Sequence, residues 1–109
     1  MSTLKDLNEE LSRILAQLIE KYNPERVILF GSLAANQLSD GSDIDLFIIK
    51  SDVPELGVDR IRQLDRMINY RIATDFVVYK PEEFDACKVS GDPFIEMILN
   101  SGKVLYEAA

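Results

Sequence analysis

Three short apolar runs, each flanked by turn-forming residues, most constrain what this chain can fold into. They cover residues 27–30, 43–50 and 71–79 and are rich in isoleucine, valine and phenylalanine. Runs of this length and composition predict buried β-strands. Around them, leucine and isoleucine recur at spacings of three and four, which predicts amphipathic helices. The combination of the two patterns indicates an α/β (α+β) domain, with a small mixed β-sheet covered by helices.

The first helical pattern extends over residues 4–19, and Asn23-Pro24 is expected to end it. The reason is that the residue before a proline is disfavoured in the helical region. A second amphipathic pattern follows over residues 56–68. Three arginines are expected on the solvated side of that second helix: Arg60, Arg62 and Arg66.

The end of the chain carries a third helix signal. Asp92 is a good N-cap and the proline after it suits the first helical position, so a helix is predicted over 94–100 and closed by Gly102. Residues 104–106 predict a short last strand. No linker or repeat divides the 109 residues, and we therefore expect one domain over 1–109.

Composition excludes several classes of function. The chain has no histidine and one cysteine, which rules out Ser-His catalysis, a histidine-ligated metal and an internal disulfide. A formal net charge of −7 disfavours nucleic acid as a partner. The sequence has neither a long apolar run nor a secretory signal pattern, so we expect a cytoplasmic protein without membrane contact. Any catalysis or ligand binding by this chain must therefore use carboxylates, hydroxyls, backbone amides and a hard metal ion.

The stretch over residues 29–46 is the most informative about function. The first predicted strand ends in Gly31-Ser32, and the second opens with Asp43-Ile44-Asp45. Because side chains alternate along a strand, Asp43 and Asp45 share a face, with Cα atoms roughly 6.6 Å apart. Two carboxylates at this spacing suit Mg²⁺, which prefers oxygen ligands and keeps substrate phosphates in its shell. Gly31 permits a close approach of phosphate, and Ser32 offers an amide and a hydroxyl.

Asp75 adds a third carboxylate. It lies between Thr74 and Phe76 in an otherwise apolar run, where an unpaired charge is unfavourable. Antiparallel or mixed pairing of neighbouring strands would bring it beside Asp43 and Asp45. Clustered carboxylates repel one another unless a cation neutralises them, which favours a metal site.

Each part of this pattern has a structural explanation when taken alone. A Gly-Ser pair after a strand is more often a simple turn, and an aspartate at a strand start, as at Asp43, is commonly a turn residue or a cap. Asp45 is harder to explain in this way, since four apolar residues follow it. The specificity lies in the combined spacing.

Gly31-Ser32, Asp43-x-Asp45 and the later Asp75 together resemble the polymerase-beta-type nucleotidyltransferase superfamily. Within it, the chain is similar to the minimal nucleotidyltransferases (MNT proteins) of bacteria and archaea. The similarity extends over nearly the whole chain and implies the nucleotidyltransferase (polymerase-beta-like) fold.

The resemblance also implies roles for the site residues. It assigns Gly31, Ser32 and Ser42 to binding of a nucleoside triphosphate. Three aspartates are expected to be catalytic and to bind one or two Mg²⁺ ions: Asp43, Asp45 and Asp75. The third of them would also activate an acceptor hydroxyl.

By the same resemblance, the reaction is transfer of a nucleoside monophosphate, AMP from ATP, to a hydroxyl group with release of pyrophosphate. MNT proteins are commonly paired with small helical HEPN toxins. The resemblance therefore implies a HEPN-type toxin as acceptor and partner, and an antitoxin role for this chain. Whether the chain also self-associates is left open.

Two alternatives remain open. In the first, the chain is a catalytically weak or inactive antitoxin that neutralises its partner by direct contact. In the second, it is a catalytic subunit that modifies a small-molecule hydroxyl, such as that of an aminoglycoside. Departures from the MNT pattern bear on the first alternative. Ala35 and Asn36 stand where members often have Arg-Gly, and Asp40-Gly41 replaces Pro-Asp.

Overall fold

The computed structural model describes residues 3–37 and 43–109. Within these residues, four strands form one sheet in the order β3-β2-β1-β4. The strands are β1 (Arg26–Phe30), β2 (Ile44–Ile49), β3 (Thr74–Tyr79) and β4 (Lys103–Glu107). Strand β1 pairs antiparallel with β2 and β4, whereas β2 and β3 are parallel. The prediction of a small mixed sheet is confirmed, including the short last strand.

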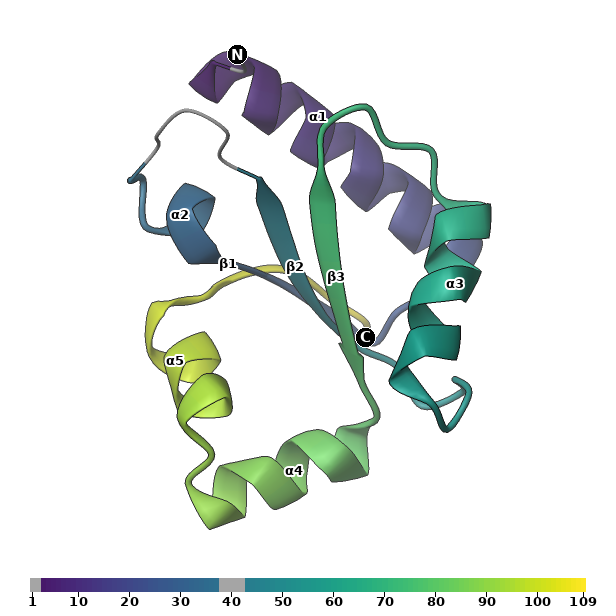
Figure 1. Ribbon diagram of the computed structural model, residues 1–109, viewed down its shortest axis with the longest axis vertical. Helices are drawn as coiled ribbons and strands as arrows, with labels where there is room; N and C mark the ends of the chain where they lie inside the picture. Colours follow the sequence, from purple (N-terminus) through teal and green to yellow (C-terminus); the bar gives the residue numbers. More distant parts are fainter. Residues whose placement is uncertain (1–2, 38–42) are drawn as a thin grey trace.

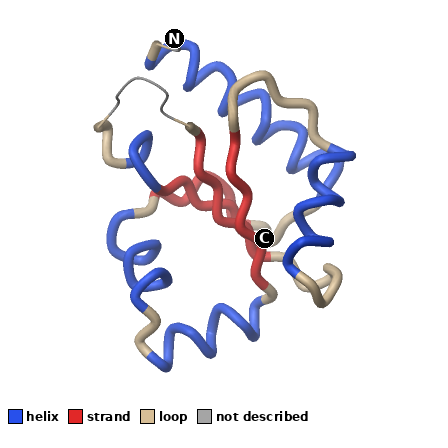
Figure 2. Tube along the Cα trace, viewed as in Figure 1, coloured by secondary structure: helices blue, strands red, loops and turns tan. Residues whose placement is uncertain are grey.

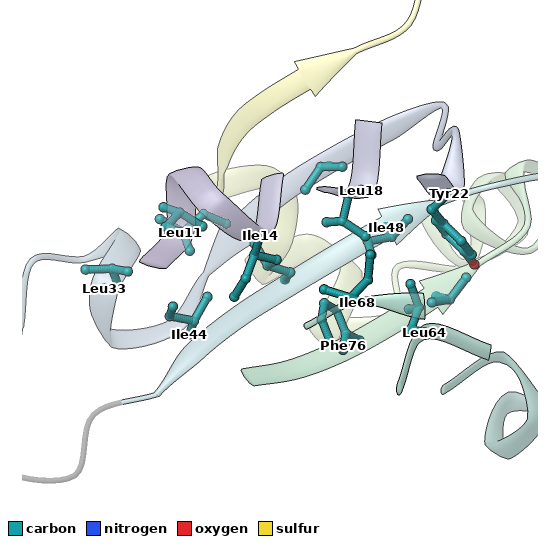
Figure 3. Packing of buried hydrophobic residues seen from close by; sticks show 14 of the residues in the cluster. Leu11, Ile14, Leu18, Tyr22, Leu33, Ile44, Ile48, Leu64, Ile68 and Phe76 are labelled. Atoms are coloured by element: carbon teal, nitrogen blue, oxygen red, sulfur yellow. The ribbon is translucent and has the colours of Figure 1, made fainter. Parts of the chain in front are cut away.

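One face of the sheet is covered by α1 (Leu4–Gln17), its π-helical continuation η1 (Leu18–Tyr22) and α3 (Gly57–Met67) (Figure 1). The predicted end of the first helix is confirmed, since Asn23 adopts a left-handed φ of 61°. The larger hydrophobic core lies between these helices and the sheet (Figure 3). Its helical residues recur at the predicted spacing: Leu7, Leu11, Ile14 and Leu18.

The opposite face is covered by α4 (Pro81–Ser90) and α5 (Pro93–Ser101) (Figures 1 and 2). A smaller core forms there, with Ile28 and Phe47 of the sheet against Phe84, Ile95 and Ile98 of the helices. Helix α4 is absent from the elements predicted above, although it begins at a proline and is followed by a glycine with a φ of 74°. Only one α4 side chain is buried, so the helix lacks the apolar stripe that revealed the others.

Arg60 of α3 corrects a second expectation. Its side chain is buried rather than solvated, while the other two arginines of that helix are exposed as predicted. The guanidinium donates to both carboxylate oxygens of Glu83 on α4, at 2.7 and 3.0 Å. It also donates to three backbone carbonyl oxygens, those of Pro54, Glu55 and Val78. Arg60 therefore joins α3, β3 and α4.

In the part of the chain that the structure describes, no helix combines the length and the apolar character needed to cross a bilayer. The observed strands differ from the predicted runs mainly at their starts. The second begins at Ile44 rather than at residue 43, and the third at Thr74 rather than at residue 71. Both differences lie at the end of the sheet that carries the candidate site.

Candidate functional site

Asp45 and Asp75 lie opposite one another in the parallel pairing of β2 with β3. Asp45 is half-buried, whereas Asp75 is exposed on the edge strand. Side chains alternate along both strands, so the two aspartates share the sheet face of Phe47 and Val77. The structure thus brings together two of the three predicted carboxylates, from strands separated in the sequence by α3.

The electrostatic environment of Asp45 reflects this proximity. Burial, together with the charge of Asp75 and a hydrogen bond to its carboxyl group, raises the pKa of Asp45 to about 6. The charge of Asp43 acts in the same direction. Neighbouring negative charges make ionisation of a carboxyl group unfavourable, and a bound cation reduces this repulsion. The arrangement therefore favours cation binding.

Gly31 packs directly against the Asp45 carboxylate. It opens the single helical turn α2 (Gly31–Ala34), immediately after Phe30, the β1 residue that pairs with Asp45. Its φ is 77°, and a Cβ placed on it would lie only 3.0 Å from Asp45 Cγ. A side chain at this position would have to displace the carboxylate. Glycine is therefore required here by backbone conformation and by close approach.

The other predicted residues lie nearby along the chain. Ser32 is half-buried in α2, and Asp43 is half-buried just before β2. Ser42, assigned above to nucleotide binding, lies outside the described residues. Figure 1 shows α2 at the end of the sheet from which β2 starts.

A metal ion can be considered for this donor set. Among residues 3–37 and 43–109, no group of three or more acidic or cysteine side chains is arranged to hold an ion by itself. Asp45 and Asp75 provide two adjacent carboxylates. Mg²⁺ is typically bound through one or two carboxylates, with substrate phosphates and water completing its shell. The donors present fit that mode of binding.

The departures from the MNT pattern have a clear structural outcome. Asn36, at the position of the MNT glycine, adopts a φ of 57°. Asparagine is one of the few non-glycine residues that tolerate this left-handed conformation. The change therefore leaves a glycine-like backbone in place. Ala35 is exposed, and what is lost there is only the charged side chain of an arginine.

A cluster of three phenylalanine rings lies next to the carboxylates, and the sequence pattern did not predict it. Phe30 packs edge-on against Phe94 of α5, with ring centroids 5.6 Å apart. Phe94 also lies 6.1 Å from Phe47. No local sequence signal indicates this cluster, because it joins three separate elements. Phe47 is fully buried, so the half-buried rings of Phe30 and Phe94 provide the apolar surface beside the site, of the kind that can pack against a planar ring.

Comparisons with known proteins show the family to which this chain belongs. The family model described as Polymerase beta, Nucleotidyltransferase matches residues 9–109. The curated "Putative protein adenylyltransferase MJ1305" of Methanocaldococcus jannaschii is 30% identical over 108 residues, which cover 94% of this chain and 74% of that protein. "Putative protein adenylyltransferase MJ0126" of the same organism is 40% identical over 48 residues, 44% of this chain and 49% of that protein.

A solved structure, described as a putative nucleotidyltransferase from Sulfolobus solfataricus, superposes with a TM-score of 0.68 at 21% identity. The match covers 95% of this chain and 83% of that one, and it shows a shared fold. The enzyme class follows from the match of the family model to nearly the whole chain, over residues 9–109. This chain belongs to the polymerase beta nucleotidyltransferase family, as its resemblance to the minimal nucleotidyltransferases implied.

Proposed function

We propose that this chain transfers AMP from ATP to a hydroxyl group of another protein, with Mg²⁺ as cofactor. The observation that carries the proposal is the pairing of Asp45 with Asp75, which sets two carboxylates side by side next to Gly31. The names of the two relatives, each "Putative protein adenylyltransferase", support AMP as the group transferred and a protein as the acceptor.

Asp45 and Asp75 would hold the metal, with Asp43 contributing from the position just before β2. When bound, Mg²⁺ supplies positive charge that offsets the triphosphate and the carboxylates. Gly31 and Ser32 would bind the triphosphate. Gly31 has no side chain of its own to block access to its backbone amide, and Ser32 contributes a hydroxyl and an amide as donors.

In the reaction, the acceptor oxygen attacks the α-phosphorus of ATP in line with the bond to the bridging oxygen. A new P–O bond forms while the bond from the α-phosphorus to the bridging oxygen breaks, and pyrophosphate leaves with the electron pair. The carboxylate of Asp75 accepts the hydroxyl proton, because it is the exposed member of the pair and the chain has no histidine.

The acceptor in this proposal is a HEPN-type helical toxin, and the chain acts as its antitoxin in the cytoplasm. Support for this part comes from the resemblance to MNT proteins, many of which are paired with such toxins. The glycine-like backbone at Asn36 supports retained activity, in preference to an antitoxin that acts by contact alone.

The test combines the purified protein with Mg²⁺ and α-labelled ATP, with and without a co-expressed HEPN-type partner. We expect metal-dependent label on the partner, and its loss to background in Asp45→Asn. Asp52→Asn, an exposed residue beyond β2, is the matched control and is expected to retain activity. A stable complex without label would instead support the contact-only antitoxin. Label only on an aminoglycoside hydroxyl would support the small-molecule alternative.

A further inference from the structure

The open edge of β3 points to the kind of acceptor that the site takes. We infer that the acceptor is an extended, basic polypeptide segment that adds to this edge as a further strand and presents a hydroxyl side chain beside Asp75. The inference rests on the proposed function and specifies its substrate. Strand β3 is the last strand on its side of the sheet, so half of its backbone groups are not used by β2.

Hydrogen bonds at the two ends of β3 establish which groups face β2. The carbonyl oxygen of Ala73 accepts from the N–H of Ile44 at 3.1 Å, and that of Tyr79 accepts from the N–H of Lys50 at 3.0 Å. Backbone direction alternates along a strand. Asp75 is separated by an even number of residues from Ala73 and from Tyr79. Its backbone N–H and C=O groups therefore also point toward β2.

The intervening residues direct their N–H and C=O groups to the open edge: Thr74, Phe76 and Val78. The carbonyl oxygen of Val78 is covered, since it accepts from Arg60 at 3.0 Å. Within the described part of the chain, no hydrogen bond occupies the outward N–H of Thr74 or Phe76. The open stretch is thus the end of β3 that carries Asp75, and Arg60 closes the edge further along.

Strand geometry then places an added segment relative to the site. A neighbouring strand lies about 4.8 Å away. In an antiparallel addition, the residue opposite Asp75 belongs to a pair without mutual hydrogen bonds, in which the Cα atoms are about 4.5 Å apart and the side chains share a face. A hydroxyl residue at that position lies next to the Asp75 carboxylate, with Asp45 on the far side.

The surroundings favour a basic segment. Asp65 lies near this edge, where it accepts a hydrogen bond from the Tyr70 hydroxyl at 3.0 Å, and the Tyr70 ring packs edge-on against Phe76. Asp75 itself is exposed, and the whole chain has a formal net charge of −7. Lysine or arginine side chains flanking the hydroxyl would complement these carboxylates.

A cleft continues the edge and offers room for apolar side chains of the segment. Its volume is about 500 Å³, and its lining combines apolar groups such as Ile61 with the ion pair of Arg60 and Glu83. The neighbours of Gly57 are unusually exposed for apolar residues, at 64% for Leu56 and 54% for Val58. Open backbone donors, acidic surroundings and a partly apolar cleft together describe a site for an extended peptide.

A seven-residue peptide that alternates lysine with valine and carries one central tyrosine tests this inference. With Mg²⁺ and labelled ATP we expect AMP on the tyrosine, and without nucleotide we expect slower hydrogen exchange at the Phe76 amide. The control peptide is N-methylated at the two residues that flank the tyrosine. It keeps the charge and the hydroxyl but loses the backbone donors, so we expect at least tenfold less labelling and no protection. Equal labelling of the two peptides would overturn the inference.

A pair of protein variants provides the reciprocal test. Thr74→Pro removes the outward N–H, whereas Thr74→Val keeps it. Both remove the side-chain hydrogen bond from Thr74 to the Ile72 carbonyl oxygen. We expect at least tenfold less peptide labelling in Thr74→Pro than in Thr74→Val, with equal Mg²⁺-ATP binding by calorimetry. The N-methylated peptide makes the same test without altering the fold of the protein.

Failure of this inference is distinguishable from failure of the proposed function. Intact Mg²⁺-ATP binding with equal labelling of both peptides, or with label only on an oligonucleotide, overturns docking at the edge and leaves nucleotidyl transfer in place. Protection of the Phe76 amide without ATP binding or label overturns the proposed function. Docking then stands as a separate property of β3.

Discussion

The carboxylate of Glu10 on α1 accepts a hydrogen bond from the backbone N–H of Ile72 at 3.1 Å. The same carboxylate accepts from the N–H of Arg71 and from the guanidinium of Arg13. Glu10 is only 6% exposed. A buried charge on α1 therefore holds the segment that leads into β3 and Asp75.

Replacement of Glu10 by glutamine should destabilise the protein. The amide cannot accept all of these bonds and leaves Arg13 without its charged partner, so we expect a loss of about 1–3 kcal/mol in the free energy of unfolding. Urea denaturation measures the change. Glu9→Gln, at an exposed neighbour on the same helix, is the control and should change stability by less than about 0.5 kcal/mol. Similar losses in both variants would contradict a special role for Glu10.

Replacement of Asp75 by asparagine should separate stability from activity. It removes a like charge directly opposite Asp45, and such pairs are destabilising by about 0.2–1 kcal/mol. In metal-free buffer we therefore expect a small gain in the free energy of unfolding, together with loss of AMP transfer. Asp85→Asn, on the exposed side of α4, should change neither quantity appreciably. A variant that is less stable than the parent without metal would contradict the repulsion.

Gly31→Ala should impair the site more than the fold. The left-handed φ of 77° disfavours alanine by roughly 1–2 kcal/mol, and the new methyl group would push against the Asp45 carboxylate. We expect a drop of at least tenfold in transfer, while circular dichroism still reports a folded protein. Gly91→Ala is a matched control, because Gly91 has a similar φ of 74° and a Cβ there would meet only Glu96 Oε1, at 3.5 Å. Equal transfer by the Gly31 variant and the parent would show that the carboxylate does not need this space.

Acid stability should depend on Glu83. Its hydrogen bond from the Arg60 guanidinium lowers the pKa of Glu83 from 4.5 to about 2. Because the pKa is lower in the folded state, the interaction contributes fully above the unfolded value, and the contribution is lost as pH falls toward 2. Since the Glu83 side chain is 39% exposed, solvent reduces the effect.

The measurement compares the parent with Glu83→Gln by urea denaturation at several pH values. We expect the parent to be more stable at pH 6, and the difference to shrink steadily between pH 4.5 and pH 2. Glu82→Gln, at the exposed neighbouring residue, should follow the parent throughout. A difference that is independent of pH would mean that the charge of Glu83 is not what stabilises the contact.

Local signals explain which elements could be predicted from the sequence. Helix α5 was predicted from Asp92, whose side chain accepts from the N–H groups of Phe94 and Ile95, because capping acts within one turn. The carboxylate pattern was likewise visible, since the pleat of a strand is a local property. What local signals could not supply were the burial of Arg60, whose partner Glu83 lies far along the chain, and the choice of parallel pairing for β2 and β3.

The parallel pairing has a consequence for how the site comes into being. Parallel strands need a crossover connection, and here α3 supplies it between the strands of Asp45 and Asp75. A hairpin fragment of β1 and β2 would contain Gly31 and Asp45 but would lack Asp75. No short excised piece of this chain can therefore serve as a miniature of the enzyme. Asp45 and Asp75 come together only when α3 has formed the crossover and β3 has paired with β2.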